Sequence, residues 1–89
     1  MRSITDIVAA EKEMFDKIWY GRSDKDPASA HPHLDSAMIN QILAAPKRVE
    51  ETYGYDEVQP GDQFEWGLLS GKLSTLRWIL GDEWDNLDS

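Results

Sequence analysis

Two histidines are the first residues of this 89-residue sequence to consider for chemistry. His31 and His33 flank Pro32, and Asp35 follows two positions later. Zinc sites in proteins usually need three or four ligands at recognisable spacings, and two histidines with one carboxylate fall short of that number. We therefore expect solvated loop histidines here, with no bound metal and no other cofactor.

A second candidate site combines aromatic and basic residues. Trp19 and Tyr20 stand close to Arg22, and such a group can stack on a base or hold a phosphate. Further positive charge for this site would come from Lys47, Arg48 and Arg77. Together these residues could bind a nucleotide-like or other anionic ligand at a subunit interface. The alternative is a helix end packed on its neighbour, with Arg22 near the terminal carbonyl groups.

Glu11 falls in the middle of an otherwise apolar helix face. A buried carboxylate must be paired, hydrogen-bonded or protonated. We expect an ion pair with Arg77, Lys72 or Arg22. The alternatives are a helix that packs incompletely, or a chemically perturbed carboxylate in a pocket.

The sequence shows no sign of enzyme chemistry. A catalytic nucleophile needs a base placed to activate it, and we find no nucleophile elbow, phosphate-binding loop, dinucleotide fingerprint or EF-hand loop. Cysteine is absent, which removes disulfides and thiolate chemistry. Carboxylates are plentiful, but no spacing indicates a hydrolase, so we do not expect an enzyme.

The elements that must position these residues are helices, and the most strongly periodic one lies near the carboxyl end. Asp62, with Glu65 three positions later, predicts a capping box at a helix start. Apolar spacing continues to residue 80 and predicts a helix over about 62–80 that ends at Gly81. One apolar stripe contains Trp66, Leu69, Leu73, Leu76 and Leu80, and a second contains Phe64, Gly67, Leu68, Gly71, Trp78 and Ile79.

Apolar stripes on two sides predict a helix that is packed on two sides and is central to the fold. Gly67 and Gly71 share one face, which favours close approach of another backbone or a large ring. We favour a tight helix crossing within the chain over a ligand groove at this face, and the sequence does not decide whether the chain itself or a second copy fills it. A membrane span is not expected, because Lys72 and other charged residues interrupt any apolar run far short of the roughly 20 residues needed.

Two further helices are predicted from apolar spacing. The first covers about residues 4–20, with Ser3 at its N-cap. The second covers about residues 34–53, where Pro46 introduces a kink or a break. We favour a kinked continuous helix, because the apolar stripe stays in phase across the proline. Residues 22–33 have the composition of a loop, and 55–61 that of an acidic turn.

These patterns predict an all-α fold, with residues 1–89 forming a single three-helix domain. The third helix is expected to be central and the second to be kinked at Pro46. A chain of this length buries only about 60–65% of its unfolded surface, and oligomerisation often compensates for a small core. We therefore expect a homodimer. Because no basic segment precedes an apolar run at the N-terminus, we expect no signal peptide and a cytoplasmic location.

The net charge of −8 lies entirely in the second half of the chain. Residues 1–49 carry seven acidic and seven basic side chains, whereas residues 50–89 carry ten acidic and two basic ones. This distribution disfavours binding to nucleic acid through phosphates and binding to anionic membranes. It is compatible with a basic protein partner, with mimicry of nucleic acid, or with simple solubility. The candidate interaction surface is Asp82, Glu83 and Asp85.

The last third of the chain carries a long motif, W-G-x-L-x-G-K-L-S-x-L-R-W-x-L-G-x-x-W-x-x-L-D. This motif resembles the ending of a family of small uncharacterised proteins encoded by bacteria and phages. The resemblance extends more loosely to residues 15–22 and 49–54. It implies a bacterial, phage or environmental origin, and it brings no activity, ligand or catalytic residue with it.

The sequence thus predicts a small acidic protein-interaction module, associated with phages or mobile elements. Its acidic second half would dock a basic partner, such as a nucleic-acid-handling host protein. The alternative function is a small binding protein for a nucleotide-like or anionic ligand.

Overall fold

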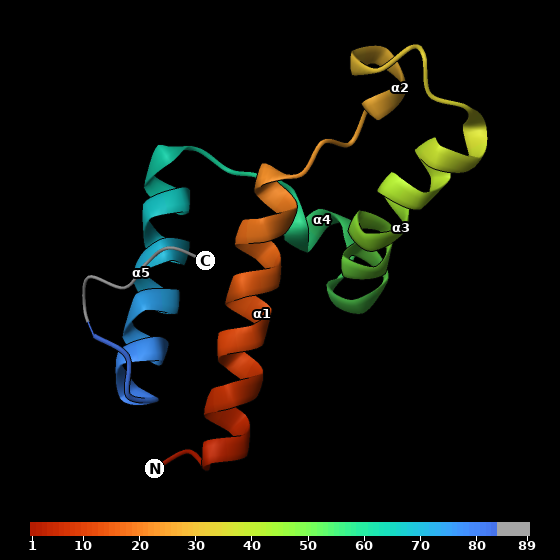
Figure 1. Ribbon diagram of the computed structural model, residues 1–89. Helices are drawn as coiled ribbons and strands as arrows, with labels where there is room; N and C mark the ends of the chain where they lie inside the picture. Colours follow the sequence, from red (N-terminus) through yellow and green to blue (C-terminus); the bar gives the residue numbers. More distant parts are fainter. Residues whose placement is uncertain (84–89) are drawn as a thin grey trace. The chain divides into compact units, whose positions relative to one another are not determined.

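The computed structural model describes residues 1–83, and every regular element in that range is an α-helix. The five helices are α1 (Ile4–Arg22), α2 (Pro27–Ala30), α3 (Ser36–Tyr53), α4 (Tyr55–Val58) and α5 (Gln63–Ile79) (Figure 1). The predicted all-α class is confirmed for this part of the chain. None of these helices is long and apolar enough to cross a membrane.

The chain divides into two compact units. Unit 1 combines residues 1–19 with the chain from Pro60 onward, and unit 2 consists of residues 20–59. Helix α1 therefore belongs to unit 1 as far as Trp19 and to unit 2 from Tyr20. The first part of α1 and helix α5 lie side by side and antiparallel in unit 1 (Figure 1).

Both ends of α5 follow from local chemistry. The Asp62 carboxylate accepts a hydrogen bond from the backbone N–H of Glu65, with an oxygen–nitrogen distance of 2.9 Å. This bond satisfies one of the N–H groups that a helix start leaves unpaired. Gly81 follows the last turn with a φ of 113°, a left-handed conformation that glycine adopts more readily than other residues.

The two apolar stripes of α5 differ in burial. In the first stripe Leu73 is only 3% exposed, and Trp66, Leu69 and Leu76 are partly buried. In the second stripe the large side chains are exposed, namely Phe64, Leu68, Trp78 and Ile79. Within the described residues, α5 is therefore covered on one side rather than on two.

Unit 2 is organised on α3, against which α2 and α4 pack. The Asp35 carboxylate caps the start of α3 by accepting a 2.9 Å hydrogen bond from the backbone N–H of Met38. The helix continues through the buried Pro46, so it is not broken there, and the kink remains a prediction. The α4 residue Val58 is 3% exposed and contributes to the small core.

Helices α2 and α4 lie where the sequence indicates a loop and an acidic turn. Each has four residues, which is too short for an apolar period to show. Pro27 is at the start of α2, where its fixed φ suits a first helical turn. Gly54, with a φ of 97°, separates α3 from α4. The prediction of three helices therefore missed two single-turn helices.

Candidate functional site

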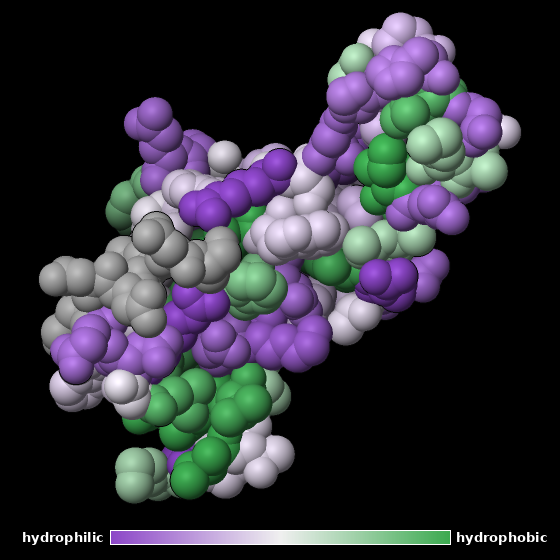
Figure 2. Space-filling model, in the orientation of Figure 1, coloured by the Kyte–Doolittle hydropathy of each residue, from purple (hydrophilic) through white to green (hydrophobic). Residues whose placement is uncertain are grey.

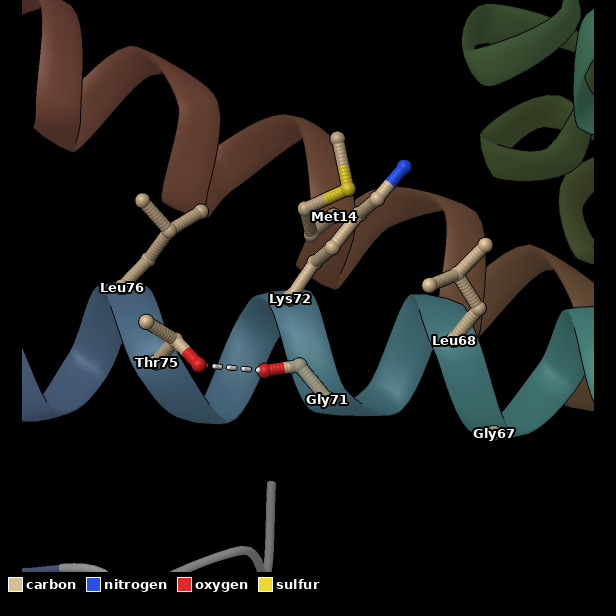
Figure 3. Close-up of a pocket in the computed structure, with 7 residues that line it drawn as sticks. All are labelled: Met14, Gly67, Leu68, Gly71, Lys72, Thr75 and Leu76. Carbon is tan, nitrogen blue, oxygen red and sulfur yellow. Dashed lines mark hydrogen bonds between the residues drawn. The ribbon is translucent and has the colours of Figure 1, made fainter.

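An open groove of about 530 Å³ runs along α5 in unit 1 (Figure 3). Its lining residues are Met14 from α1 and Gly67, Leu68, Gly71, Lys72, Thr75 and Leu76 from α5. Leu68, Lys72 and Leu76 project from α5 on the side of α1, close to Met14 (Figure 3). Among these described lining residues, only Lys72 is ionisable, so the groove is an apolar surface.

The two glycines leave open space on the side of α5 away from α1. A Cβ atom built on Gly67 or Gly71 has no neighbouring atom within 4 Å among residues 1–83. Each glycine costs up to about 1 kcal/mol of helix stability relative to alanine, and packing among the described residues does not offset that cost. The Thr75 hydroxyl donates a 2.9 Å hydrogen bond to the Gly71 carbonyl oxygen (Figure 3), so its polar group is satisfied within the helix.

Large exposed apolar side chains accompany these glycines. The exposed fraction is 77% for Phe64, 50% for Leu68, 49% for Trp78 and 52% for Ile79. At 100° per residue Phe64 and Trp78 lie on the glycine side of the helix, whereas Leu68 and Ile79 lie on the flank between the glycines and Lys72. We call this surface the α5 face, consisting of Phe64, Gly67, Leu68, Gly71, Thr75, Trp78 and Ile79. Contiguous exposed apolar surface on a small protein is typical of a binding site.

The apolar surface also extends toward the start of α1. Figure 2 shows green, hydrophobic atoms gathered in unit 1 where the start of α1 lies beside the end of α5. The exposed apolar side chains of these two segments are Ile4, Val8, Ile79 and Leu80. Because Ile79 belongs to both surfaces, the α5 face reaches this second area.

An ion pair joins the two helices of unit 1. Arg77 Nε donates to Glu11 Oε1 at 3.2 Å, and the guanidinium carbon lies 5.5 Å from the centroid of the Phe15 ring. Of the three cations that the sequence offers as partners for Glu11, the structure selects Arg77. The Arg77 Nε group is therefore engaged inside unit 1.

Tyr20 is the most buried aromatic residue of unit 2, with 1% of its surface exposed. Its hydroxyl donates to Glu50 Oε2 at 2.6 Å and accepts from Gln59 Nε2 at 3.1 Å. Lys25 Nζ lies 4.3 Å from the ring centroid and donates to the Tyr20 carbonyl oxygen. Both the ring and the hydroxyl of Tyr20 therefore have partners within unit 2, and the assignment of Tyr20 to a ligand site stays a prediction that these contacts do not favour.

Burial has opposite effects on the pKa values of Tyr20 and Lys25. It raises the pKa of the Tyr20 hydroxyl, and the hydrogen bond to Glu50 raises that pKa further. It lowers the pKa of the Lys25 ammonium, because the charged form loses solvation. Tyr20, Lys25, Glu50 and Gln59 thus form a structural polar cluster.

The other residues predicted to bind an anion are distributed over both units. Trp19, which is 39% exposed, belongs to unit 1 together with Arg77. Arg22, Lys47 and Arg48 are exposed and belong to unit 2. Neither unit contains the complete set.

The remaining predicted site residues are exposed or lie outside residues 1–83. Asp82 and Glu83 are exposed just beyond α5, whereas Asp85 lies outside the described residues. The rings of His31 and His33 meet edge to face with centroids 5.9 Å apart. Within residues 1–83 no group of three or more histidines and carboxylates could hold a metal ion.

Sequence reasoning identified the residues of the α5 face except Thr75, but it did not show that they form an open surface. The available signal was the pair of glycines on a second apolar stripe, which indicated a close approach without saying what approaches. No protein-family model, curated protein or solved structure matches this chain.

Proposed function

We propose that this protein is a small protein-interaction module and that the α5 face is its contact surface. The observation that carries the proposal is the exposure of Phe64, Leu68, Trp78 and Ile79 beside an open groove. Helical recognition commonly uses apolar anchors about one turn apart on a single face. Phe64 and Leu68 have that spacing, and Gly71 and Thr75 occupy the turns between Leu68 and Trp78. The glycines allow another backbone to approach closely.

The chemistry of the groove favours binding over catalysis. General acid–base and nucleophilic catalysis need ionisable or nucleophilic side chains placed within reach of one another. Lys72 stands among apolar and small neighbours in the described lining. A partner would therefore gain mainly from burial of apolar surface.

Exposed carboxylates flank α5 at both ends, and they support a preference for a basic partner. Asp62 and Glu65 lie at its start, and Asp82 and Glu83 follow its end. Complementary charge would speed association and suppress wrong partners. We further propose a bacterial or phage origin, a cytoplasmic location and a nucleic-acid-handling protein as the partner class. These proposals rest on the resemblance of the chain's last third and on its charge.

Under the proposed function α5 would be packed on two sides, as its two apolar stripes predict. One face of α5 carries Leu73, buried in unit 1, and a partner would cover the other. The alternative of a nucleotide-like ligand has less support, because Tyr20 is buried and Arg77 is paired with Glu11.

Site-specific photocrosslinking tests the proposal in cells that produce the protein. A photoreactive phenylalanine analogue at Leu68 is expected to give discrete protein adducts. The matched control is the same analogue at Lys12, whose side chain is 71% exposed on α1 and lies outside the α5 face. Absence of adducts at position 68, or equal adducts at both positions, would exclude the α5 face as a contact surface.

A further inference from the structure

We propose that a second copy of this chain covers the α5 face, with the two α5 helices antiparallel and crossing near Gly71. This inference rests on the proposed function, because it names the occupant of the same surface. It is carried by the architecture of unit 1, by the area of the exposed face and by the symmetry of that face.

The second apolar side of α5 in unit 1 needs another element to cover it. Two helices, the first part of α1 and α5, make up its regular structure among the described residues. A helix with apolar residues on two sides must bury the second side against another element. Two copies joined through α5 would form a four-helix bundle, with both α5 helices inside and both α1 helices outside.

The exposed side chains alone supply most of the area that a weak dimer needs. Phe64 and Trp78 are 77% and 49% exposed, and Leu68 and Ile79 are about half exposed. With about 150–250 Å² for an aromatic side chain, these four residues leave roughly 400 Å² uncovered in each copy. Two copies would bury roughly 800 Å² from these side chains alone, before the groove floor is added, and specific interfaces begin near 1,000–1,200 Å². We therefore expect a Kd of about 1–100 µM.

The α5 face is complementary to itself under a two-fold rotation. Phe64 and Trp78 lie at equal sequence distances on either side of Gly71, and so do Gly67 and Thr75. An antiparallel pair centred on Gly71 therefore places the large rings opposite each other at the ends and small residues opposite each other at the crossing. A two-fold dimer needs a surface that is complementary to itself in this way.

The negative charge of each copy determines how dimerisation should depend on salt concentration. Each copy carries a net charge of −8, and an antiparallel pair brings the acidic start of one α5 near Asp82 and Glu83 of the other. Salt screens such repulsion, so the dimer is expected to strengthen as salt rises. A complex with a basic partner would weaken instead, which separates the two kinds of occupant.

Sedimentation equilibrium of the full chain is the first test. The wild type is expected to dimerise, and Gly71→Gln is expected to weaken the dimer at least about tenfold. Glutamine keeps the charge and tolerates a helix, and a Cβ atom at this position meets no atom of the described residues within 4 Å, so the variant should fold. Ala44→Gln, at an exposed position on α3, is the matched control and should dimerise as the wild type does.

Single-cysteine variants test the direction of the pairing, because the chain has no cysteine of its own. Gly71→Cys is expected to cross-link to itself on oxidation, as cysteines with closely approaching backbones do. With a short bis-maleimide, Phe64→Cys is expected to link to Trp78→Cys in mixtures and not to itself. Self-linking of Phe64→Cys would overturn the antiparallel arrangement.

A monomeric wild type at concentrations well above the expected Kd would overturn the inference, and so would a dimer that Gly71→Gln leaves unchanged. The proposed function fails separately. If the protein is monomeric but position 68 cross-links to other proteins, the interaction surface stands and only the occupant is wrong. If position 68 gives no adduct of any mass, both proposals fail.

Discussion

Two polar contacts between residues distant in sequence stabilise the units from within. In unit 1, Glu11 and Arg77 join α1 to α5 at 3.2 Å, with side-chain exposures of 24% and 14%. In unit 2, the Tyr20 hydroxyl reaches Glu50 and Gln59. Both contacts involve residues that the sequence presented as candidates for ligand chemistry, and the structure uses them to hold helices together.

Removing one partner of the Glu11–Arg77 pair should destabilise the fold, whereas removing both partners should leave the free energy of unfolding nearly unchanged. We expect Arg77→Met to lower the free energy of unfolding by about 1–2 kcal/mol, because Glu11 loses its partner in a partly apolar setting. The double variant Glu11→Met, Arg77→Met should recover most of that loss. Urea denaturation of the wild type, the single variants and the double variant measures the coupling. Strictly additive losses would show that the pair does not act as a unit.

Tyr20 should make the fold sensitive to alkali. Burial raises its pKa above the ordinary value of 10.0, so below pH 10 it is protonated in both the folded and unfolded states. As the pH rises through the folded pKa, the unfolded state has already released its proton, and stability falls. Lys25 has the opposite sign, because its pKa is lowered from 10.5 and the cost of burying its charge is relieved as the pH rises.

The variant Tyr20→Phe isolates this contribution. At neutral pH it should lose about 1–2 kcal/mol, because Glu50 is left without its hydroxyl donor. Between about pH 8 and pH 11 the wild type should lose stability relative to the variant. Urea denaturation at both pH values provides the comparison, and a constant difference between the two proteins would show that Tyr20 does not titrate with unfolding.

At the scale of single elements, α5 combines a well-defined start and end with an uncovered side. Its capping bond and its terminal glycine are local features, and both follow from neighbouring residues. Its second apolar stripe is different, because its glycines face open space in the described chain. Two interior glycines that have no contact within the described residues agree with our proposal that this side of α5 binds another chain.

Two glycine substitutions should have opposite effects on stability. Gly71→Ala should raise the free energy of unfolding by up to about 1 kcal/mol, since alanine favours the helix and finds space. Gly81→Ala should lower it by about 1 kcal/mol, since its φ of 113° strains any residue with a Cβ. Thermal unfolding in dilute solution, where self-association is absent, checks both effects. Destabilisation by Gly71→Ala would indicate that the helix already packs closely at that face.

At the scale of the whole molecule, the excess negative charge opposes both folding and self-association. The net charge is −8, and carboxylates such as Glu51, Asp56 and Glu57 are exposed in unit 2. Repulsion among like charges destabilises a folded protein and also keeps copies apart. The apolar α5 face must overcome this repulsion to bind a second copy, and a basic partner would relieve it.

Added salt should therefore stabilise the fold of the monomer. Raising sodium chloride from about 0.01 M to about 0.3 M shortens the screening length severalfold. We expect the free energy of unfolding to rise by roughly 0.5–1 kcal/mol. Urea denaturation at the two salt concentrations measures this rise, and the variant Glu51→Gln, Asp56→Asn should show a smaller one. A decrease with salt would mean that attractive ion pairs outweigh the repulsion.

The sequence by itself determined the features that depend on near neighbours. Helix spacing located α1, α3 and α5, and Asp62 identified a helix start, because capping and amphipathic periodicity involve residues a few positions apart. It also singled out Glu11 as a carboxylate in need of a partner. Helices α2 and α4 escaped detection because four residues form a helix only with support from packing, here against α3.

Only the tertiary structure decided which distant residues meet and which surfaces remain exposed. It selected Arg77 over two other cations for Glu11, buried Tyr20 against Glu50, and left Phe64 and Trp78 exposed. Burial and pairing depend on residues that are far apart along the chain, so no local pattern determines them. An apolar stripe on a helix has the same periodicity whether it faces the protein's own core or another chain, and for α5 only the structure showed that the large side chains of the second stripe are exposed.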